Sequence, residues 1–239
     1  MGFMNTKPRV FVGTLYCGEG DFDKCSESIA LQKDVDVCHV VIENLPEKEA
    51  HNKLWQSWRD AKESGFDMFV KVDADTVLAH DSVLSEFWSL MKSDSRITGI
   101  QAPLDDYFTE GLINGLNCFS PKVVFNDTAD ELFCDRNVDV NHDRVIKAGN
   151  VPIQLIPAGY HCHYANDKQA FHFGLHRALK NQTKIISDVR KSFERHNDRL
   201  REIALCGAFL GECNPIGVGF NYNDQRFIKS FELTLKRFE

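Results

Sequence analysis

The chain has 239 residues, of which 43% are hydrophobic, 26% charged and 11% aromatic, and its net charge is −7. This length and apolar content suit one α/β domain with a buried core, and the aromatic content argues against disorder. No basic stripe is present, no apolar run reaches the ~20 residues that span a bilayer, and the N-terminus lacks an apolar signal-peptide core. We therefore expect no nucleic-acid partner and no transmembrane segment.

Short runs rich in β-branched and aromatic residues predict strands, and apolar residues at helical spacing predict helices. In chain order, the pattern predicts a strand at 9–16, a helix at 21–32, a strand at 35–43, a helix at 47–64, a strand at 67–72, a helix at 82–91 and a strand at 97–103. This alternation implies βαβ units and a largely parallel sheet. Such sheets bind their ligands beyond the carboxyl ends of the strands.

The second half of the chain is less regular. Short strands are expected at 114–120 and 151–156, and the chain looks helical from 168 to about 209. A glycine-rich stretch at 211–221 then precedes a short final helix. No internal repeat or linker is visible, so we expect one α/β domain with a helical C-terminal appendage.

Eight cysteines are spread along the chain without any Cys-x-x-Cys pair. Several lie in apolar, strand-like segments, which is typical of buried free thiols. Free thiols are the rule in reducing compartments. We therefore predict free cysteines and a cytoplasmic location.

The pattern Asp-x-Asp occurs three times, beginning at positions 21, 34 and 73. The first lies at a predicted helix start and the second in a helix-to-strand turn, which are ordinary places for aspartate. Only Asp73 and Asp75 end an apolar strand, within VKVDADTVL, and project toward the expected ligand cleft. Two carboxylates there offer hard oxygen ligands to a divalent cation that also binds phosphate.

Five of the nine histidines fall between positions 142 and 176. His161 and His163 are separated by one residue in a segment expected to be extended, where alternate residues share a face. Both rings could therefore point at one site, and imidazole suits Mn²⁺ better than Mg²⁺. A pair of core histidines without a metal is the alternative. His172 and His176, one helical turn apart, could be ligands too, although packing within a helix is the expected role of both.

The strand FDMFVKVDADTVL resembles the metal-binding strand of the GT-A fold nucleotide-sugar glycosyltransferases, in particular their family 2-like members. The segments VFVGTLYCGEGDFDKCSESIALQ, CHVVIENLPEKEAHNKLWQSW, GLINGLNCFS, DVNHDRVIKAG and HCHYANDKQAFHFGLHRALK resemble further parts of that family in the family's order. The resemblance covers roughly residues 8–180. It implies a Rossmann-like, mostly parallel sheet flanked by helices, with a nucleotide-sugar-binding and catalytic domain at 1–180 and a helical extension of it at 181–239.

The resemblance also implies roles for individual residues. The donor nucleotide would be bound by Thr14, Tyr16, Glu43, Asn52, Lys53, Asp73, Ala74 and Asp75. Ordinary roles stay open for several of these: a packed strand end for Tyr16, a helix cap for Glu43 and a solvated surface position for Lys53.

For the metal, the resemblance implies Mn²⁺ or Mg²⁺ held by Asp73 and Asp75 and completed by a late histidine, for which we favour His163 over His161. A carboxylate would remove the acceptor's hydroxyl proton. The family pattern selects Asp139, with Asp143 as the second candidate.

Asp105 and Asp106, near the start of the acceptor region, are further candidates for the base. A Val residue, Val138, precedes Asp139 where the family usually carries a second acidic residue, which leaves the choice of base and the inverting outcome open.

The implied function is metal-dependent transfer of a sugar, in the manner of a hexosyltransferase, from a nucleoside diphosphate sugar to a carbohydrate or glycan acceptor hydroxyl, with inversion and with UDP as the expected nucleotide. A sugar nucleotidyltransferase is the first alternative, although GTLYCGEGDF has no Arg or Lys for a phosphate loop. A non-catalytic protein with the same fold would not need Asp73 and Asp75. A metallohydrolase is the third alternative, and the chain lacks its HxHxDH-type cluster.

Overall fold

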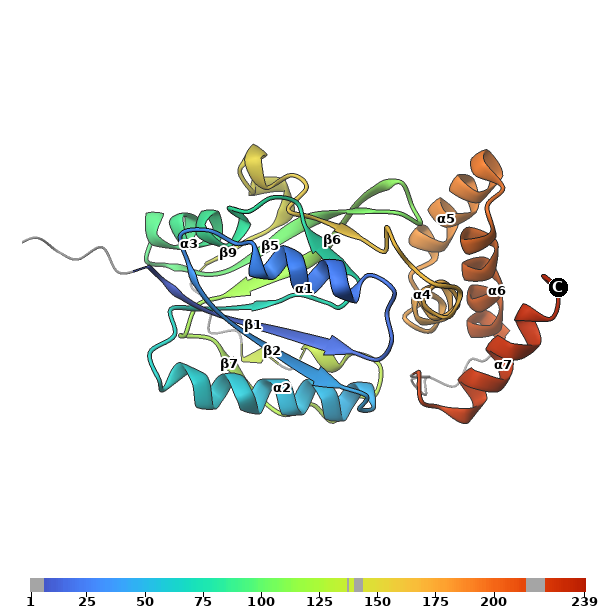
Figure 1. Cartoon of the computed structure of the whole chain (residues 1–239), viewed down its shortest axis with the longest axis horizontal. Coiled ribbons are helices and arrows are strands. Elements are labelled where there is room, and N and C mark those ends of the chain that lie inside the picture. Colours follow the sequence, from blue (N-terminus) through green and yellow to red (C-terminus); the bar gives the residue numbers. More distant parts are fainter. Residues whose placement is uncertain (1–6, 137, 140–143, 214–221) are drawn as a thin grey trace, which may run out of the picture.

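The computed structural model describes residues 7–136, 138–139, 144–213 and 222–239. Strands and helices alternate in the first half, and helices form the C-terminal part (Figure 1). The helices are α1 Phe22–Ala30, α2 Glu47–Lys62, α3 Val83–Ser93, α4 Asp167–Leu179, α5 Thr183–His196, α6 Arg199–Cys213 and α7 Gln225–Leu235. The strands are β1 Arg9–Tyr16, β2 Asp36–Glu43, β3 Met68–Lys71, β4 Thr76–Leu78, β5 Ile97–Asp106, β6 Gly111–Phe119, β7 Val124–Phe125, β8 Val138–Asp139, β9 Arg144–Ile146 and β10 Gly159–His161. Short 3₁₀ turns are η1 Cys134–Arg136, η2 Ala148–Asn150 and η3 Ile153–Leu155.

Every element predicted up to residue 103 forms, with ends displaced by at most three residues. The predicted strand at 151–156 is wrong, because that segment contains the turn η3 and the strand β10 begins only at Gly159. Pro152 and Pro157 flank this turn. Neither has a backbone N–H to donate to a sheet, which disfavours a strand there.

The main sheet runs in the order β2-β1-β3-β6-β5-β10-β4, and β9 pairs with β5. Parallel pairings join β1 to β2 and β3, and β5 to β9 and β10. β6 is antiparallel to β3 and β5, and β4 is antiparallel to β10. Six of these strands therefore run in one direction, and among the described residues only β4 and β6 oppose them. The structure confirms the predicted α/β class with a mostly parallel sheet.

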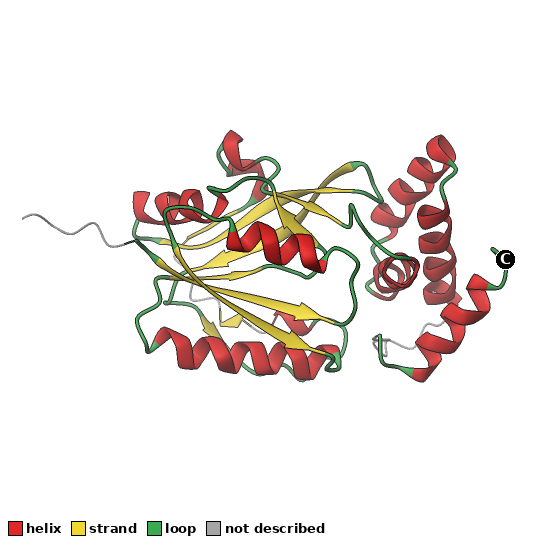
Figure 2. Cartoon of the chain, viewed as in Figure 1, coloured by secondary structure: helices red, strands yellow, loops and turns green. Residues whose placement is uncertain are grey.

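Helices cover both faces of the sheet (Figure 2). α1 and α3 lie on one face, and α2 lies on the other with its buried Trp55 and Trp58 turned inward. Trp55 stacks on Phe125 with ring centroids 4.5 Å apart, and Trp58 stacks on Phe69 at 5.3 Å. Positions 54, 55 and 58 fall on one side of a 3.6-residue helix, so the apolar spacing of α2 sets which face is buried.

The C-terminal helices lie beyond the carboxyl ends of β1 and β2 (Figure 1). α4 and α6 cross so closely that a Cβ atom on Gly174 would lie 1.7 Å from the backbone oxygen of Ala204. Phe173 of α4 stacks on Phe108, which follows β5, with ring centroids 4.4 Å apart. This contact fixes α4 against the edge of the sheet where the parallel strands end.

No helix in the described part of the chain is both long and apolar enough to cross a membrane. All eight cysteines are free, as predicted.

Candidate functional site

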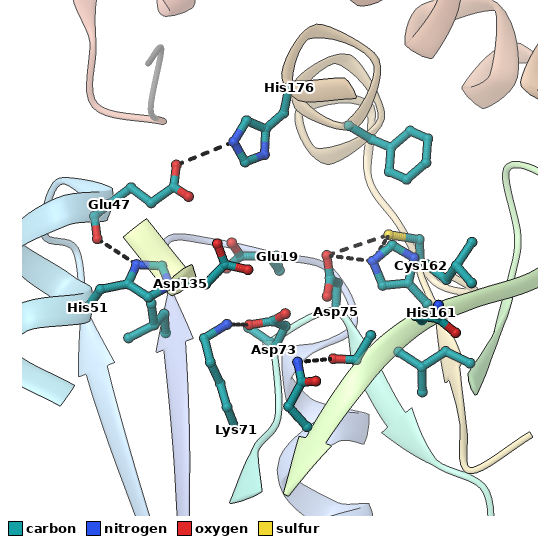
Figure 3. Close-up of a pocket in the computed structure, with 18 of the residues that line it drawn as sticks. Glu19, Glu47, His51, Lys71, Asp73, Asp75, Asp135, His161, Cys162 and His176 are labelled. Carbon is teal, nitrogen blue, oxygen red and sulfur yellow. Dashed lines mark hydrogen bonds and ion pairs between the residues drawn. The ribbon is translucent and has the colours of Figure 1, made fainter. Parts of the chain in front are cut away.

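A cavity of about 940 Å³ lies between the strand ends and α4 (Figure 3). Its wall on the α4 side consists of Gln169, His172, Phe173, His176, Arg177 and Lys180. These positions recur at intervals of three and four residues, so they occupy one face of the helix. The opposite wall includes the two aspartates that follow β3. The cavity therefore occupies the position where α/β sheets bind ligands.

Asp73 and Asp75 lie in the tight turn between β3 and β4, where the Asp73 carbonyl accepts a hydrogen bond from Thr76 N at 2.9 Å. Both aspartates line the cavity. Asp73 is paired with the Lys71 ammonium at the end of β3. Burial disfavours the charge on Lys71, but Asp73 raises the pKa of its ammonium above the usual value. The pair therefore sets a positive and a negative charge together at the cavity wall.

Asp75 is the start of a connected set of polar groups. Its Oδ2 atom lies 3.4 Å from Nε2 of His161, whose Nδ1 donates to Oδ1 of Asp106 at 2.7 Å. The other oxygen of Asp106 accepts hydrogen bonds from the backbone N–H and the hydroxyl of Thr109, at 2.8 and 2.7 Å. Burial opposes the charged imidazole, but the carboxylates of Asp75 and Asp106 raise the pKa of His161 well above its usual value. Asp106 thus orients the ring so that Nε2 faces Asp75.

The residues around Asp75 fit a divalent cation. Ligand atoms of Asp75, His161 and Cys162 all lie within 4.8 Å of one another. The Oδ1 atom of Asp75 is buried and has no hydrogen-bond partner among the described residues. A buried carboxylate oxygen in this condition is costly unless a cation or water satisfies it. The Asp106–His161 pair is also the arrangement by which metal-binding histidines are oriented.

His161 and His163 do not share a face, which overturns that expectation. His161 is buried and lines the cavity, whereas His163 is exposed and lies 3.5 Å from Asp105, measured from Nε2 to Oδ2. The strand β10 ends at His161, and Cys162 adopts a left-handed conformation with φ of 59°. This backbone turn breaks the alternation of an extended strand. The geometry therefore favours His161 over His163 as a cavity ligand.

Thr14 and Tyr16 lie at the end of β1 but are not among the residues that line the cavity. The Thr14 hydroxyl is buried and lies 2.9 Å from Nε2 of His39 on β2. Tyr16 stacks on Phe22 with ring centroids 4.1 Å apart. Both side chains are thus engaged in contacts with neighbouring elements.

Glu43, Asn52 and Lys53 are also outside the cavity lining. Glu43 is the exposed last residue of β2. The Asn52 amide holds the loop after β7, since it donates to the carbonyl of Thr128 at 3.1 Å and accepts from its N–H at 2.7 Å. Lys53 is exposed on the outer surface of α2. Of the predicted nucleotide contacts, the cavity contains Asp73, Ala74 and Asp75.

The carboxylates predicted as bases are distributed differently. Asp143 lies outside the described residues, and Asp139 is described only by its strand pairing with Val124. Asp105 lies beside His163. Asp106 is buried and orients the His161 ring, so it acts through that ring and not as the base.

Sequence reasoning missed a second polar group at the other end of the cavity, which includes Glu47, His51 and His176 (Figure 3). Oε2 of Glu47 lies 3.7 Å from Nε2 of His176. Burial raises the pKa of Glu47 to about 7, against the opposing effect of Lys180. Burial and the nearby Lys71 lower the pKa of His51 to about 4. The i, i+4 spacing of Glu47 and His51 within the predicted helix was the available signal.

Glu19, in the loop after β1, was missed as well. It lines the cavity, and its Oε2 accepts a hydrogen bond from the backbone N–H of Cys17 at 2.7 Å. Burial, together with repulsion from Asp75, raises the pKa of Glu19 to about 7. A carboxylate with this pKa can accept a proton near neutral pH. No pattern in the sequence distinguishes Glu19 from an ordinary loop glutamate.

No protein-family model matches the sequence, and no curated protein sequence matches it. Among solved structures, the chain is similar to protein A197 from STIV, with 9% identity, coverage of 48% of this chain and 65% of that one, and a TM-score of 0.36. A glycosyltransferase involved in glycosylation of the major capsid of PBCV-1 matches with 14% identity, coverage of 47% and 60%, and a TM-score of 0.34. The mannosyltransferase PcManGT from Pyrobaculum calidifontis, in complex with GDP-Man and Mn²⁺, matches with 13% identity, coverage of 97% and 81%, and a TM-score of 0.41.

The chain thus spans less than two thirds of the length of the first two of these proteins. All three TM-scores lie below 0.5, so these similarities carry no argument about the function of the chain.

Proposed function

We propose that the protein is a divalent-metal-dependent glycosyltransferase that moves a sugar from a nucleoside diphosphate sugar to a hydroxyl of a carbohydrate or glycan acceptor. The observation that carries the proposal is the buried, unpartnered Oδ1 of Asp75 beside the oriented Nε2 of His161. Both lie at the edge of the sheet where ligands bind. A cavity of about 940 Å³ is large enough for a nucleotide sugar, since sites for such ligands span ~300–1,000 Å³.

Asp73, Asp75 and His161 would hold the cation, with Mn²⁺ favoured over Mg²⁺ because of the imidazole. Bound there, the ion would act as a Lewis acid that neutralises charge on the diphosphate. The protein adds its own cations across the cavity, since Arg177 of α4 and Lys180, which follows the helix, line the opposite wall. Charged donors of this kind bind phosphate oxygens strongly. The diphosphate would then lie between the aspartates and α4.

In the transfer step, the acceptor's hydroxyl oxygen forms a bond to the anomeric carbon of the donor. The bond from that carbon to the diphosphate oxygen breaks, and the nucleoside diphosphate leaves with the electron pair. The hydroxyl proton passes to a carboxylate base. Asp139 and Asp143 remain the bases proposed from the resemblance. Glu19 and Glu47 both line the cavity with a pKa of about 7, and we favour Glu19 as a third candidate because its charge interacts directly with Asp75 of the proposed cation site.

The proposal is tested by the melting temperature of the full chain with UDP, GDP and their sugars, each with Mn²⁺ or with EDTA. Ligands that bind the native state raise the melting temperature by mass action. We expect a rise with nucleotide plus Mn²⁺ and a much smaller one with EDTA. Equal stabilisation in both conditions would reject a metal-bridged site, and no stabilisation by any nucleotide would reject the donor.

Asp75→Asn should abolish most of the Mn²⁺-dependent rise and of sugar transfer while the protein stays folded. The matched control is Asp36→Asn, since Asp36 also belongs to an Asp-x-Asp pair but is exposed at the amino end of β2. This control should behave as the unaltered protein. Product analysis separates the alternative chemistry, since a sugar nucleotidyltransferase releases pyrophosphate, whereas a glycosyltransferase releases the nucleoside diphosphate.

A further inference from the structure

The end of the cavity away from Asp75 holds a second set of metal-binding atoms. The carboxylate of Glu47, the imidazole of His51 and the thiol of Cys134 have ligand atoms that all lie within 4.8 Å of one another. They come from the first turns of α2 and from η1. The proposed sugar transfer does not use this set.

The His51 ring is oriented for coordination. Nδ1 lies 2.8 Å from the backbone carbonyl of Glu47, and because a carbonyl only accepts, Nδ1 carries the proton and donates. Nε2 therefore keeps its lone pair. A histidine that donates one ring N–H to a carbonyl and presents the other nitrogen is the usual form of a metal-binding histidine. Glu47 and His51 are four residues apart on α2, so they lie on the same face of the helix.

His176 brings a fourth ligand from α4. Its Nε2 atom is buried, has no hydrogen-bond partner within the described ranges, and lies 3.7 Å from Oε2 of Glu47. A buried ring nitrogen without a partner is costly, and a metal ion would satisfy it. In Figure 3 the His176 ring points from α4 toward Glu47, across the cavity from the helix that carries His51.

We propose that Glu47, His51, Cys134 and His176 form a zinc site. Two imidazoles, a thiolate and a carboxylate are four ligands of the types that Zn²⁺ binds in tetrahedral geometry. Tetrahedral bonds of ~2.0–2.3 Å place ligand atoms roughly 3.5 Å apart. Side-chain rotations would draw Glu47, His51 and Cys134 together from within 4.8 Å, and His176 would turn toward them from its position 3.7 Å from Glu47. The carboxylate and the thiolate balance the double charge of the ion. Thiolate also selects zinc over magnesium or manganese.

Binding would displace the hydrogen bond by which the Cys134 thiol now donates to the carbonyl of Asp130, at 3.1 Å. It would also release the thiol proton, since a metal-bound thiol is deprotonated. The ion would join α2, η1 and α4, which are far apart in the sequence. A filled site would therefore fix α4 across the cavity.

Cobalt provides a direct test, because Co²⁺ occupies zinc sites and gives a strong absorption band when a thiolate binds it. The full chain, stripped of metal with EDTA and dialysed, is titrated with Co²⁺ alone. We expect the thiolate band in the unaltered protein and its loss in Cys134→Ser. Two controls retain Cys134: Cys17→Ser, which alters a cysteine of the cavity wall, and Cys162→Ser, which alters the thiol beside Asp75. Both should keep the band.

A band that disappears in Cys162→Ser and persists in Cys134→Ser would assign the thiolate site to Asp75 and overturn the proposal. Absence of any band in the unaltered protein at saturating Co²⁺ would overturn it as well. The proposal does not depend on the proposed sugar transfer, so Asp75→Asn should keep the Cys134-dependent band whether or not nucleotide binding is lost.

Zinc affinity, measured by competition with a coloured chelator, tests the other ligands. His176→Ala should weaken Zn²⁺ binding at least ~10-fold, since ligands and the groups that orient them contribute about this much to metal affinity. Melting without metal shows whether the variant is folded. A folded His176→Ala protein that binds Zn²⁺ as tightly as the unaltered one would remove α4 from the site.

Discussion

At the scale of single residues, the site depends on how buried polar side chains are oriented. His161 is held by Asp106, and Asp106 is itself satisfied by two hydrogen bonds from Thr109. The hydrogen bond to Asp106 keeps a proton on Nδ1 and turns Nε2 toward Asp75, where a bound cation would replace the second proton that the raised pKa of His161 implies. Asp106 acts on the cavity only through His161.

Asp106→Asn should weaken Mn²⁺ binding by about 10–100-fold, which is the usual effect of changing a group that orients a metal-binding histidine. An amide can present its own N–H to Nδ1, and the ring would then carry its proton on Nε2. Mn²⁺ affinity is measured by calorimetry on the full chain. The neighbouring Asp105→Asn serves as control, since Asp105 contacts the exposed His163. If Asp105→Asn weakened Mn²⁺ binding and Asp106→Asn did not, the metal would belong with His163.

Glu19 provides a prediction about pH. Its pKa rises from 4.5 to about 7 on folding, mainly because of burial, so the folded state binds the proton more tightly than the unfolded state. The tighter proton binding by Glu19 contributes to the free energy of unfolding. This contribution is present in full below about pH 4.5 and is lost as the pH rises through about 7. Glu19→Gln should therefore reduce, by about 1–3 kcal/mol, the fall in unfolding free energy between pH 4.5 and 8. Urea unfolding of both metal-free proteins across this range measures it, and identical pH dependence would contradict it.

At the scale of elements, the contact between α4 and α6 decides where α4 places the side chains that line the cavity, Arg177 among them. A Cβ atom on Gly174 would lie 1.7 Å from the backbone oxygen of Ala204, and one on Gly207 would lie 2.1 Å from that of Phe171. These are backbone contacts, which cannot be relieved by rotating a side chain. The two glycines therefore allow α4 to sit between α6 and the sheet edge.

Gly174→Ala should lower the free energy of unfolding by about 2–3 kcal/mol or more, since overpacking against backbone forces the helices apart. The same change should weaken ligand binding in the cavity, because α4 forms one of its walls. Gly149→Ala is the matched control, since a Cβ atom there would meet nothing within 4 Å. Urea unfolding compares the two variants, and equal stability would show that the helices can separate at little cost.

At the scale of the whole molecule, the C-terminal helices and the sheet are expected to behave as one unit. Phe108 and Phe173 belong to the same apolar cluster, which continues from the loop after β5 into α4, α6 and α7. The cavity has one wall on the sheet and one on α4. We therefore propose that residues 181–239 extend the domain at 1–180 rather than forming a separate one.

This proposal predicts a single unfolding transition. The three tryptophans, Trp55, Trp58 and Trp88, all lie on α2 and α3, so their fluorescence reports on the sheet with its flanking helices. Circular dichroism also reports on the C-terminal helices. In urea, the two signals should change at the same midpoint, as they do for a cooperative unit. Circular dichroism that is lost at a lower urea concentration than the fluorescence would identify the appendage as an independent domain.

Local patterns in the sequence were enough to predict the α/β class and most element positions. The residue types of β1 and the apolar spacing of α2 predict these elements, because strand alternation and helical periodicity depend only on residues that are close in the sequence. Asp73 and Asp75 could be placed at the cavity because they directly follow a predicted parallel strand. The carboxyl ends of parallel strands form the edge of an α/β sheet at which ligands bind. No strand forms at 151–156, although its apolar residues favour one, because Pro152 within the segment and Pro157 after it cannot donate backbone hydrogen bonds to a sheet.

The sequence by itself thus determined the class of fold and the position of Asp73 and Asp75. Only the tertiary structure decided which histidine faces them, because a left-handed residue at Cys162 turns His163 away from the cavity. It also brought Glu47 to His176, which is 129 positions further along the chain (176 − 47), at a distance of 3.7 Å. That contact depends on how α4 crosses the sheet edge. The crossing is set by packing against α6 and Phe108, and no short pattern in the sequence specifies such packing.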